Sequence, residues 1–128
     1  MKNIKLIGIL AICLLSFGCA SILPGNDPIA VRAEQVERSA IAAFDAYVHI
    51  EYINRTNLAK VSTDFLKVAD NIRRNSTNWV ISLDHTILAY KHNRAESNKV
   101  SLATALATVS TALAEAESNI AKAAAIAK

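Results

Sequence analysis

The chain has 128 residues, enough for one domain, and carries a formal net charge of +3. Its two cysteines, Cys13 and Cys19, both lie near the N-terminus, so the rest of the chain has no disulfide framework. No Gly or Pro follows Pro28, and alanine is abundant. Because tight β-turns usually require Gly, this composition disfavours hairpin-rich β structure and predicts an all-α domain.

The charge does not predict a nucleic-acid partner. When Lys2 and Lys5 of the N-terminal leader are subtracted from the 14 Lys and Arg residues, 12 remain against 11 Asp and Glu residues. The largest basic cluster, at residues 67–74, is interrupted by acidic side chains. This distribution is typical of a solvated helix face, whereas nucleic-acid binding normally requires a clustered basic surface.

The first residues have the pattern of an export signal. Lys2 and Lys5 form a positive region, and residues 6–18 are apolar apart from Ser16. Residues 6–25 carry no charge and match the ~20 residues of a transmembrane helix, so an uncleaved anchor is an alternative, as is an ordinary cleaved signal. The stretch ends in small residues and a Pro-Gly pair, which favours cleavage over a span.

Residues 14–19, Leu-Leu-Ser-Phe-Gly-Cys, resemble the lipobox of bacterial lipoproteins. Gly18 and Cys19 fit that pattern, whereas Ser16 and Phe17 depart from it. The resemblance implies a signal peptide over residues 1–18 and a lipid, such as palmitate, on Cys19.

The same resemblance implies a location in the cell envelope. It implies that residues 19–27 form the lipidated Cys and a short tether. It also implies more than one acyl chain on Cys19, and two or more acyl chains hold a protein stably to a bilayer. Ala20 after the cysteine implies the outer membrane, with the domain facing the periplasm. An inner-membrane location with an uncleaved N-terminal anchor is the alternative.

Residues 28–128 are expected to form a single helical bundle domain. Asp27 can cap a helix, and Pro28 is tolerated at a first helical position. Apolar residues recur at spacings of three and four in four segments, at residues 28–57, 58–72, 75–90 and 98–127. A break at residues 57–62 and polar clusters at residues 71–78 and 92–98 separate them. The sequence predicts a small antiparallel bundle of four helices; the alternative is three helices with a long bent first helix.

Charged pairs four residues apart support the first segment. Glu34–Arg38 and Glu51–Arg55 have the favourable order of acid before base, and both are predicted to lie on its solvent side.

The last segment has the clearest repeat. Apolar residues alternate at spacings of four and three, and 11 of residues 101–128 are alanine, so the helix is slender. This pattern is typical of a coiled-coil contact, which either closes the domain's own bundle or binds a partner helix or a second copy. The candidate partner-binding residues in this repeat are Leu102, Leu106, Val109 and Leu113. Tyr52 and Trp79 are further candidates, because such aromatic residues are enriched in binding hot spots.

No catalytic motif or cofactor site is recognisable. His49, His85 and His92 are weak candidates for metal ligands, since a zinc site usually needs a tighter pair with further ligands. The domain has no Gly from which to build a nucleophile elbow or a phosphate-binding loop. The sequence therefore favours a membrane-anchored helical protein that acts by binding or structure through protein–protein contacts, not an enzyme. The alternative is a periplasmic carrier of a small ligand or metal in the bundle interior.

Overall fold

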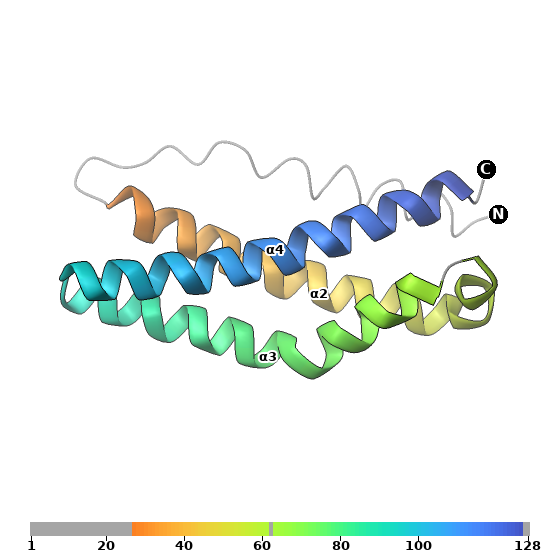
Figure 1. The fold of residues 1–128 in the computed structure, drawn as a ribbon, viewed down its shortest axis with the longest axis horizontal. Coiled ribbons are helices and arrows are strands. Elements are labelled where there is room, and N and C mark those ends of the chain that lie inside the picture. Colours follow the sequence, from red (N-terminus) through yellow and green to blue (C-terminus); the bar gives the residue numbers. More distant parts are fainter. Residues whose placement is uncertain (1–26, 62, 127–128) are drawn as a thin grey trace.

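The computed structural model of the protein describes residues 27–61 and 63–126. These residues form three helices and no strand: α2 spans Pro28–Val61, α3 spans Thr63–His92 and α4 spans Glu96–Ile126. Each helix packs against the other two, and together they form one elongated bundle (Figure 1). None of the three has the length and apolar character that a membrane-crossing helix needs.

The all-α prediction is confirmed, but the described part of the chain has three helices where four were predicted. The alternative of three helices has the right number of helices. It joined the first and second predicted segments, however, whereas the structure joins the second and third. In the structure α2 ends at Val61, within the predicted break, and the second and third segments together form α3. The turn predicted at residues 71–78 is therefore wrong, because these residues lie in the middle of a helix.

The polar cluster in α3 interrupts the core without interrupting the helix. Ile72 and Leu83 are buried, whereas no residue between them is fully buried. Asn75 donates a side-chain hydrogen bond to the carbonyl oxygen of Asn71 at 3.1 Å, one helical turn back. With neither Gly nor Pro to break it, the helix continues through the cluster and changes direction near its middle (Figure 1).

The connection between α3 and α4 lies in the predicted polar cluster at residues 92–98. Residues 93–95 are non-helical, and the Asn93 side chain accepts a hydrogen bond from the backbone N–H of Ala95 at 3.1 Å. Asn98 donates to the carbonyl oxygen of Asn93 at 2.8 Å. These asparagines supply bonds that the adjoining helix ends lack, so the chain reverses in three residues.

The core runs along the centre of the bundle and draws on all three helices. Its most completely buried apolar side chains are Tyr47 of α2, Ile72 and Leu83 of α3, and Leu102 and Val109 of α4. The phenol ring of Tyr47 stacks on the ring of Phe65 with centroids 4.7 Å apart. Burial, and to a lesser degree the charge of Glu115, raise the pKa of Tyr47 far above its usual range.

Asp27 caps α2, as predicted, and also fastens the end of the bundle. One carboxylate oxygen accepts from the Ile29 N–H at 2.9 Å, and the other accepts from the Tyr90 hydroxyl at 2.8 Å. These hydrogen bonds lower the pKa of Asp27, the bond from Tyr90 more than the bond from Ile29. Since folding favours the carboxylate form of Asp27, its two hydrogen bonds stabilise the fold at pH values above the ordinary carboxyl pKa. This stabilisation is lost as the pH falls through the lowered pKa of Asp27 in the folded protein.

Candidate functional site

The candidate partner-binding residues of the last helix lie against this chain's own core. Leu102 and Val109 are completely buried, and Leu106 and Leu113 are partly buried and pack against the same cluster. The repeat in α4 therefore closes the bundle, and these four side chains do not form an open surface.

The two aromatic candidates have different surroundings. Tyr52 is 76% exposed on α2. Trp79 is half-buried on α3, and its ring lies 6.0 Å from that of Phe44, centroid to centroid. Of the two, Trp79 is therefore the one whose ring packs against a neighbouring helix.

The three histidines are all exposed. They come from α2 and α3, and no group of three His, Cys, Asp or Glu side chains in the described residues could hold a metal ion. Cys19, the predicted signal peptide and residues 20–26 of the predicted tether lie outside the described residues.

A groove between α2 and α3 is the most distinctive concave surface that described residues line. Its volume is about 380 Å³, and its lining comprises Ile41, Phe44, Asp45, Val48, Arg73, Ser76, Thr77, Val80 and Ile81. We call this feature the α2–α3 groove. Ile41 and Ile81 stand at its edges with 51% and 48% of their surfaces exposed.

The polar cluster of α3 explains why the groove exists. Ser76 and Thr77 line the groove, and Ser76 lies one helical turn after the buried Ile72, where the core stripe would call for a larger apolar side chain. These short side chains leave the space between the two helices unfilled. The sequence feature that was mistaken for a turn is thus one wall of the groove.

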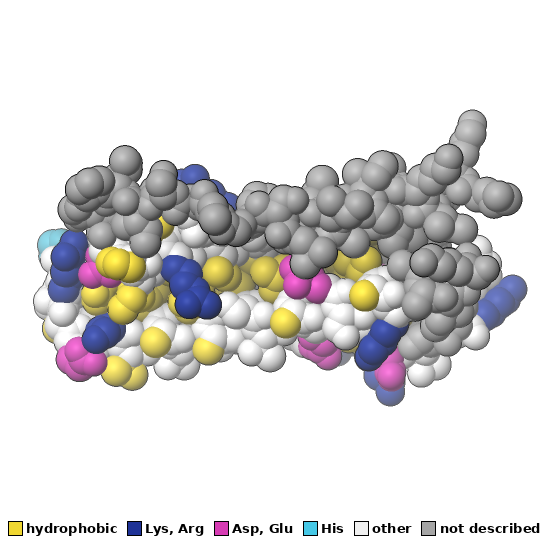
Figure 2. All heavy atoms as spheres, turned by 90° about the horizontal axis from the view of Figure 1, so that it is seen from above, with side chains coloured by type: hydrophobic (Ala, Val, Ile, Leu, Met, Phe, Trp, Pro, Cys, Tyr) yellow, Lys and Arg dark blue, Asp and Glu magenta, His cyan; other side chains and the backbone are white. Residues whose placement is uncertain are grey.

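Exposed apolar surface is not confined to this groove. On the face that Figure 2 presents, hydrophobic side chains form a discontinuous row along the molecule. A wider hollow of about 660 Å³ lies between α3 and α4, but its α4 wall consists mainly of Ala and Thr side chains with little apolar reach. The α2–α3 groove differs from both of these surfaces because it is concave and is also lined by large apolar side chains on both helices.

Acidic side chains lie in and next to the groove. Asp45 lines it and is exposed, Glu37 lies one helical turn before the lining residue Ile41 on α2, and Asp84 lies one turn after the lining residue Val80 on α3. Partial burial, then the negative charges of Asp84 and Glu34, raise the pKa of Glu37, and the nearby Arg38 only partly offsets this. Like charges from two helices thus act on one another at this end of the groove.

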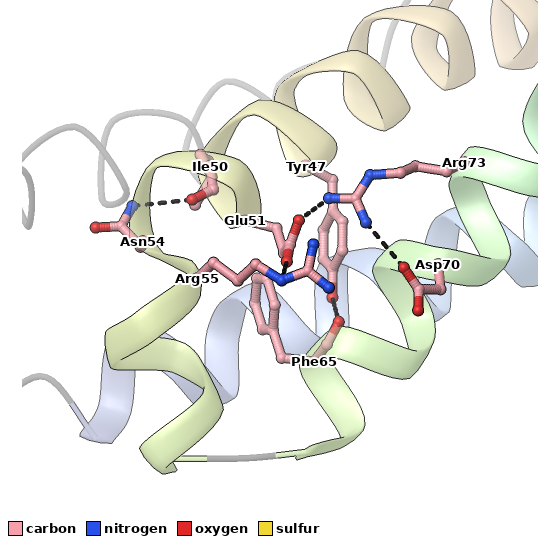
Figure 3. A network of polar contacts seen from close by, with 8 residues as sticks. All are labelled: Tyr47, Ile50, Glu51, Asn54, Arg55, Phe65, Asp70 and Arg73. Atoms are coloured by element: carbon pink, nitrogen blue, oxygen red, sulfur yellow. Dashed lines mark hydrogen bonds and ion pairs between the residues drawn. The ribbon is translucent and has the colours of Figure 1, made fainter.

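The groove residue Arg73 belongs to an ion-pair network around the buried Glu51 (Figure 3). Glu51 is completely buried, and one of its carboxylate oxygens accepts a hydrogen bond from Arg73. Its other oxygen, Oε1, lies 3.7 Å from Nε of Arg55 and accepts no hydrogen bond from the described residues. Arg73 also donates to Asp70 at 2.9 Å, so two carboxylates neutralise the guanidinium that lines the groove.

The predicted solvent-side position of the Glu51–Arg55 pair is wrong for Glu51. Arg55 is 54% exposed, but the Glu51 carboxylate is directed inward, between Arg55 and Arg73 (Figure 3). The pairing with Arg73 decides this orientation, and that residue lies 22 positions further along the chain. No local spacing rule could have found it.

Comparison with protein-family models, with curated proteins and with solved structures finds no match to this chain.

Proposed function

We propose that the protein is a small lipid-anchored helical protein of the bacterial cell envelope that acts through protein–protein contacts. The observation that carries the binding part is the α2–α3 groove, whose apolar edges Ile41 and Ile81 are exposed beside acidic side chains. Protein interfaces commonly combine an apolar centre with a polar rim in this way.

The anchoring part of the proposal depends on the N-terminal sequence. Its support is the lipobox-like stretch that ends at Gly18-Cys19. Residues 20–26 could span only about 20 Å when extended, which would keep the groove near the membrane surface. We place the domain in the periplasm on the outer membrane, with an inner-membrane anchor as the alternative.

No specific observation favours either of the two alternatives, a ligand or metal carrier and association of two copies through the C-terminal helix. A carrier of a metal or small ligand would use the bundle interior, yet His49, His85 and His92 are exposed, and the hollows described above open at the surface. Association of two copies through the C-terminal helix would have to use its outer side, since Leu102 and Val109 are buried.

Metabolic labelling with a palmitate analogue tests the anchor. We expect the wild-type chain to take up label and to sediment with membranes, and Cys19→Ser to lose both properties, because Cys19 is the only proposed lipid site. Cys13→Ser is the matched control and should keep the label. Label that persists on Cys19→Ser, or a wild-type chain without label, would refute the lipid anchor.

A further inference from the structure

We propose that the α2–α3 groove binds an amphipathic helix of a partner protein, one with apolar side chains along one face and Lys or Arg beside them. This inference rests on the proposed function and specifies the chemistry of the partner.

The apolar part of the inference comes from the edges and floor of the groove. Ile41 and Ile81 are about half exposed on opposite walls, and Phe44 is buried between the helices beneath them. Covering two such side chains removes apolar surface from water, at about 25 cal/mol per Å². The partner must therefore present apolar groups along the groove.

The basic part of the inference comes from the balance of charge around the groove. The guanidinium of Arg73, which lines the groove, is already paired with Glu51 and Asp70. Asp45 lines the groove, and Glu37 and Asp84 lie one helical turn beyond its lining residues Ile41 and Val80. At Glu37, the charge of Arg38 only partly opposes the charge of Asp84. A cationic partner would relieve the repulsion between Glu37 and Asp84, whereas an anionic membrane surface would add to it.

The shape of the groove favours a helix as the occupant. It follows two packed helices, and Ile41 and Val48 are seven residues apart on one face of α2. The lining residues 41–48 of α2 and 73–81 of α3 each cover about 11–12 Å at 1.5 Å per residue, roughly two helical turns. A third helix can place its ridge of side chains in such a channel between two others.

Titration of the full chain with designed peptides tests this inference. The probes are a Leu/Lys amphipathic helix of about 14 residues and its Leu/Glu counterpart, both without Trp. The full chain is held in phosphatidylcholine vesicles. The chain has a single Trp, Trp79, which packs on the groove residue Phe44 and itself lines the α3–α4 hollow. Its fluorescence therefore reports peptide bound to the folded domain, not peptide bound to lipid, and the groove variants below assign the site. We expect the Leu/Lys peptide to bind about tenfold more tightly than the Leu/Glu peptide, and added salt to reduce the difference.

Matched variants locate the binding. Ile81→Ser should weaken Leu/Lys binding about tenfold, because it removes an apolar edge of the groove. Ile53→Ser, at another exposed isoleucine of α2, should bind like the wild type. Glu37→Gln should weaken binding of the Leu/Lys peptide, because it removes a carboxylate that attracts the Lys side chains. It should not lower the melting temperature, because it also removes the repulsion between Glu37 and Asp84. Glu117→Gln on α4 is its control.

Two results would overturn the inference. One is equal binding of the two peptides, and the other is an equal effect of Ile81→Ser and Ile53→Ser. Neither result bears on lipid labelling at Cys19, so failure of this inference can be told apart from failure of the proposed anchor.

Discussion

Replacement of Arg73 by Met is expected to lower the free energy of unfolding by about 3 kcal/mol. The substitution keeps much of the apolar stem but removes the guanidinium that donates a hydrogen bond to Glu51. Glu51 is completely buried, and its second oxygen already lacks a hydrogen-bond donor among the described residues. Removing one partner of a buried pair typically costs about 3–5 kcal/mol. We take the lower end because the Arg73 side chain is 29% exposed and Arg55 lies 3.7 Å from the same carboxylate.

Urea unfolding followed by Trp79 fluorescence measures this effect. The double variant Glu51→Leu/Arg73→Met should recover most of the loss, because it removes the stranded charge together with its partner. Arg74→Met, at the exposed neighbouring position, should change the free energy of unfolding by no more than about 0.5 kcal/mol. If Arg73→Met proves as mild as Arg74→Met, the buried network does not stabilise the contact between α2 and α3.

Replacement of Leu102 by Ala is expected to lower the free energy of unfolding by about 3 kcal/mol. Leu102 is completely buried in the core cluster of the three helices. Loss of a buried Leu side chain costs about 2–5 kcal/mol through lost burial and the remaining cavity. The high helix propensity of Ala offsets little of this cost.

The same unfolding measurement, with Val100→Ala as control, decides what the α4 repeat is for. Val100 is 57% exposed, so its truncation should have an effect below about 0.5 kcal/mol. If the repeat served mainly to bind a partner, the isolated Leu102→Ala chain would be as stable as the wild type. That outcome would contradict the packing of α4 against α2 and α3.

Much of the fold follows from local patterns in the sequence. The absence of Gly and Pro after residue 28 correctly predicted an all-α domain, and the Asp27 cap and the break before residue 63 were also found. Three helices were only the alternative prediction, because a polar cluster can be either a turn or a continuous stretch of helix. Residues 71–78 are the second case: Ile72 is buried in the core, and Arg73, Ser76 and Thr77 line the groove beside α2.

The candidate site could not be predicted from the sequence. The α2–α3 groove depends on which residues of α3 come to lie opposite Ile41 and Phe44, and this is fixed by packing between distant parts of the chain. The buried Glu51 was missed because its spacing to Arg55 is typical of an exposed pair. The lipid anchor on Cys19 stays a prediction, since it falls outside the described residues.

Site-specific photocrosslinking in the intact host cell tests whether the protein is membrane-anchored and binds another protein through the α2–α3 groove. A photoreactive residue placed at Ile81 should form one discrete adduct of higher mass, and the same residue at Ile53 should not. The adduct should diminish when Cys19 is also replaced by Ser, because the chain then leaves the membrane. Adducts of equal yield from both positions, or none from Ile81, would show that the groove does not bind a partner protein.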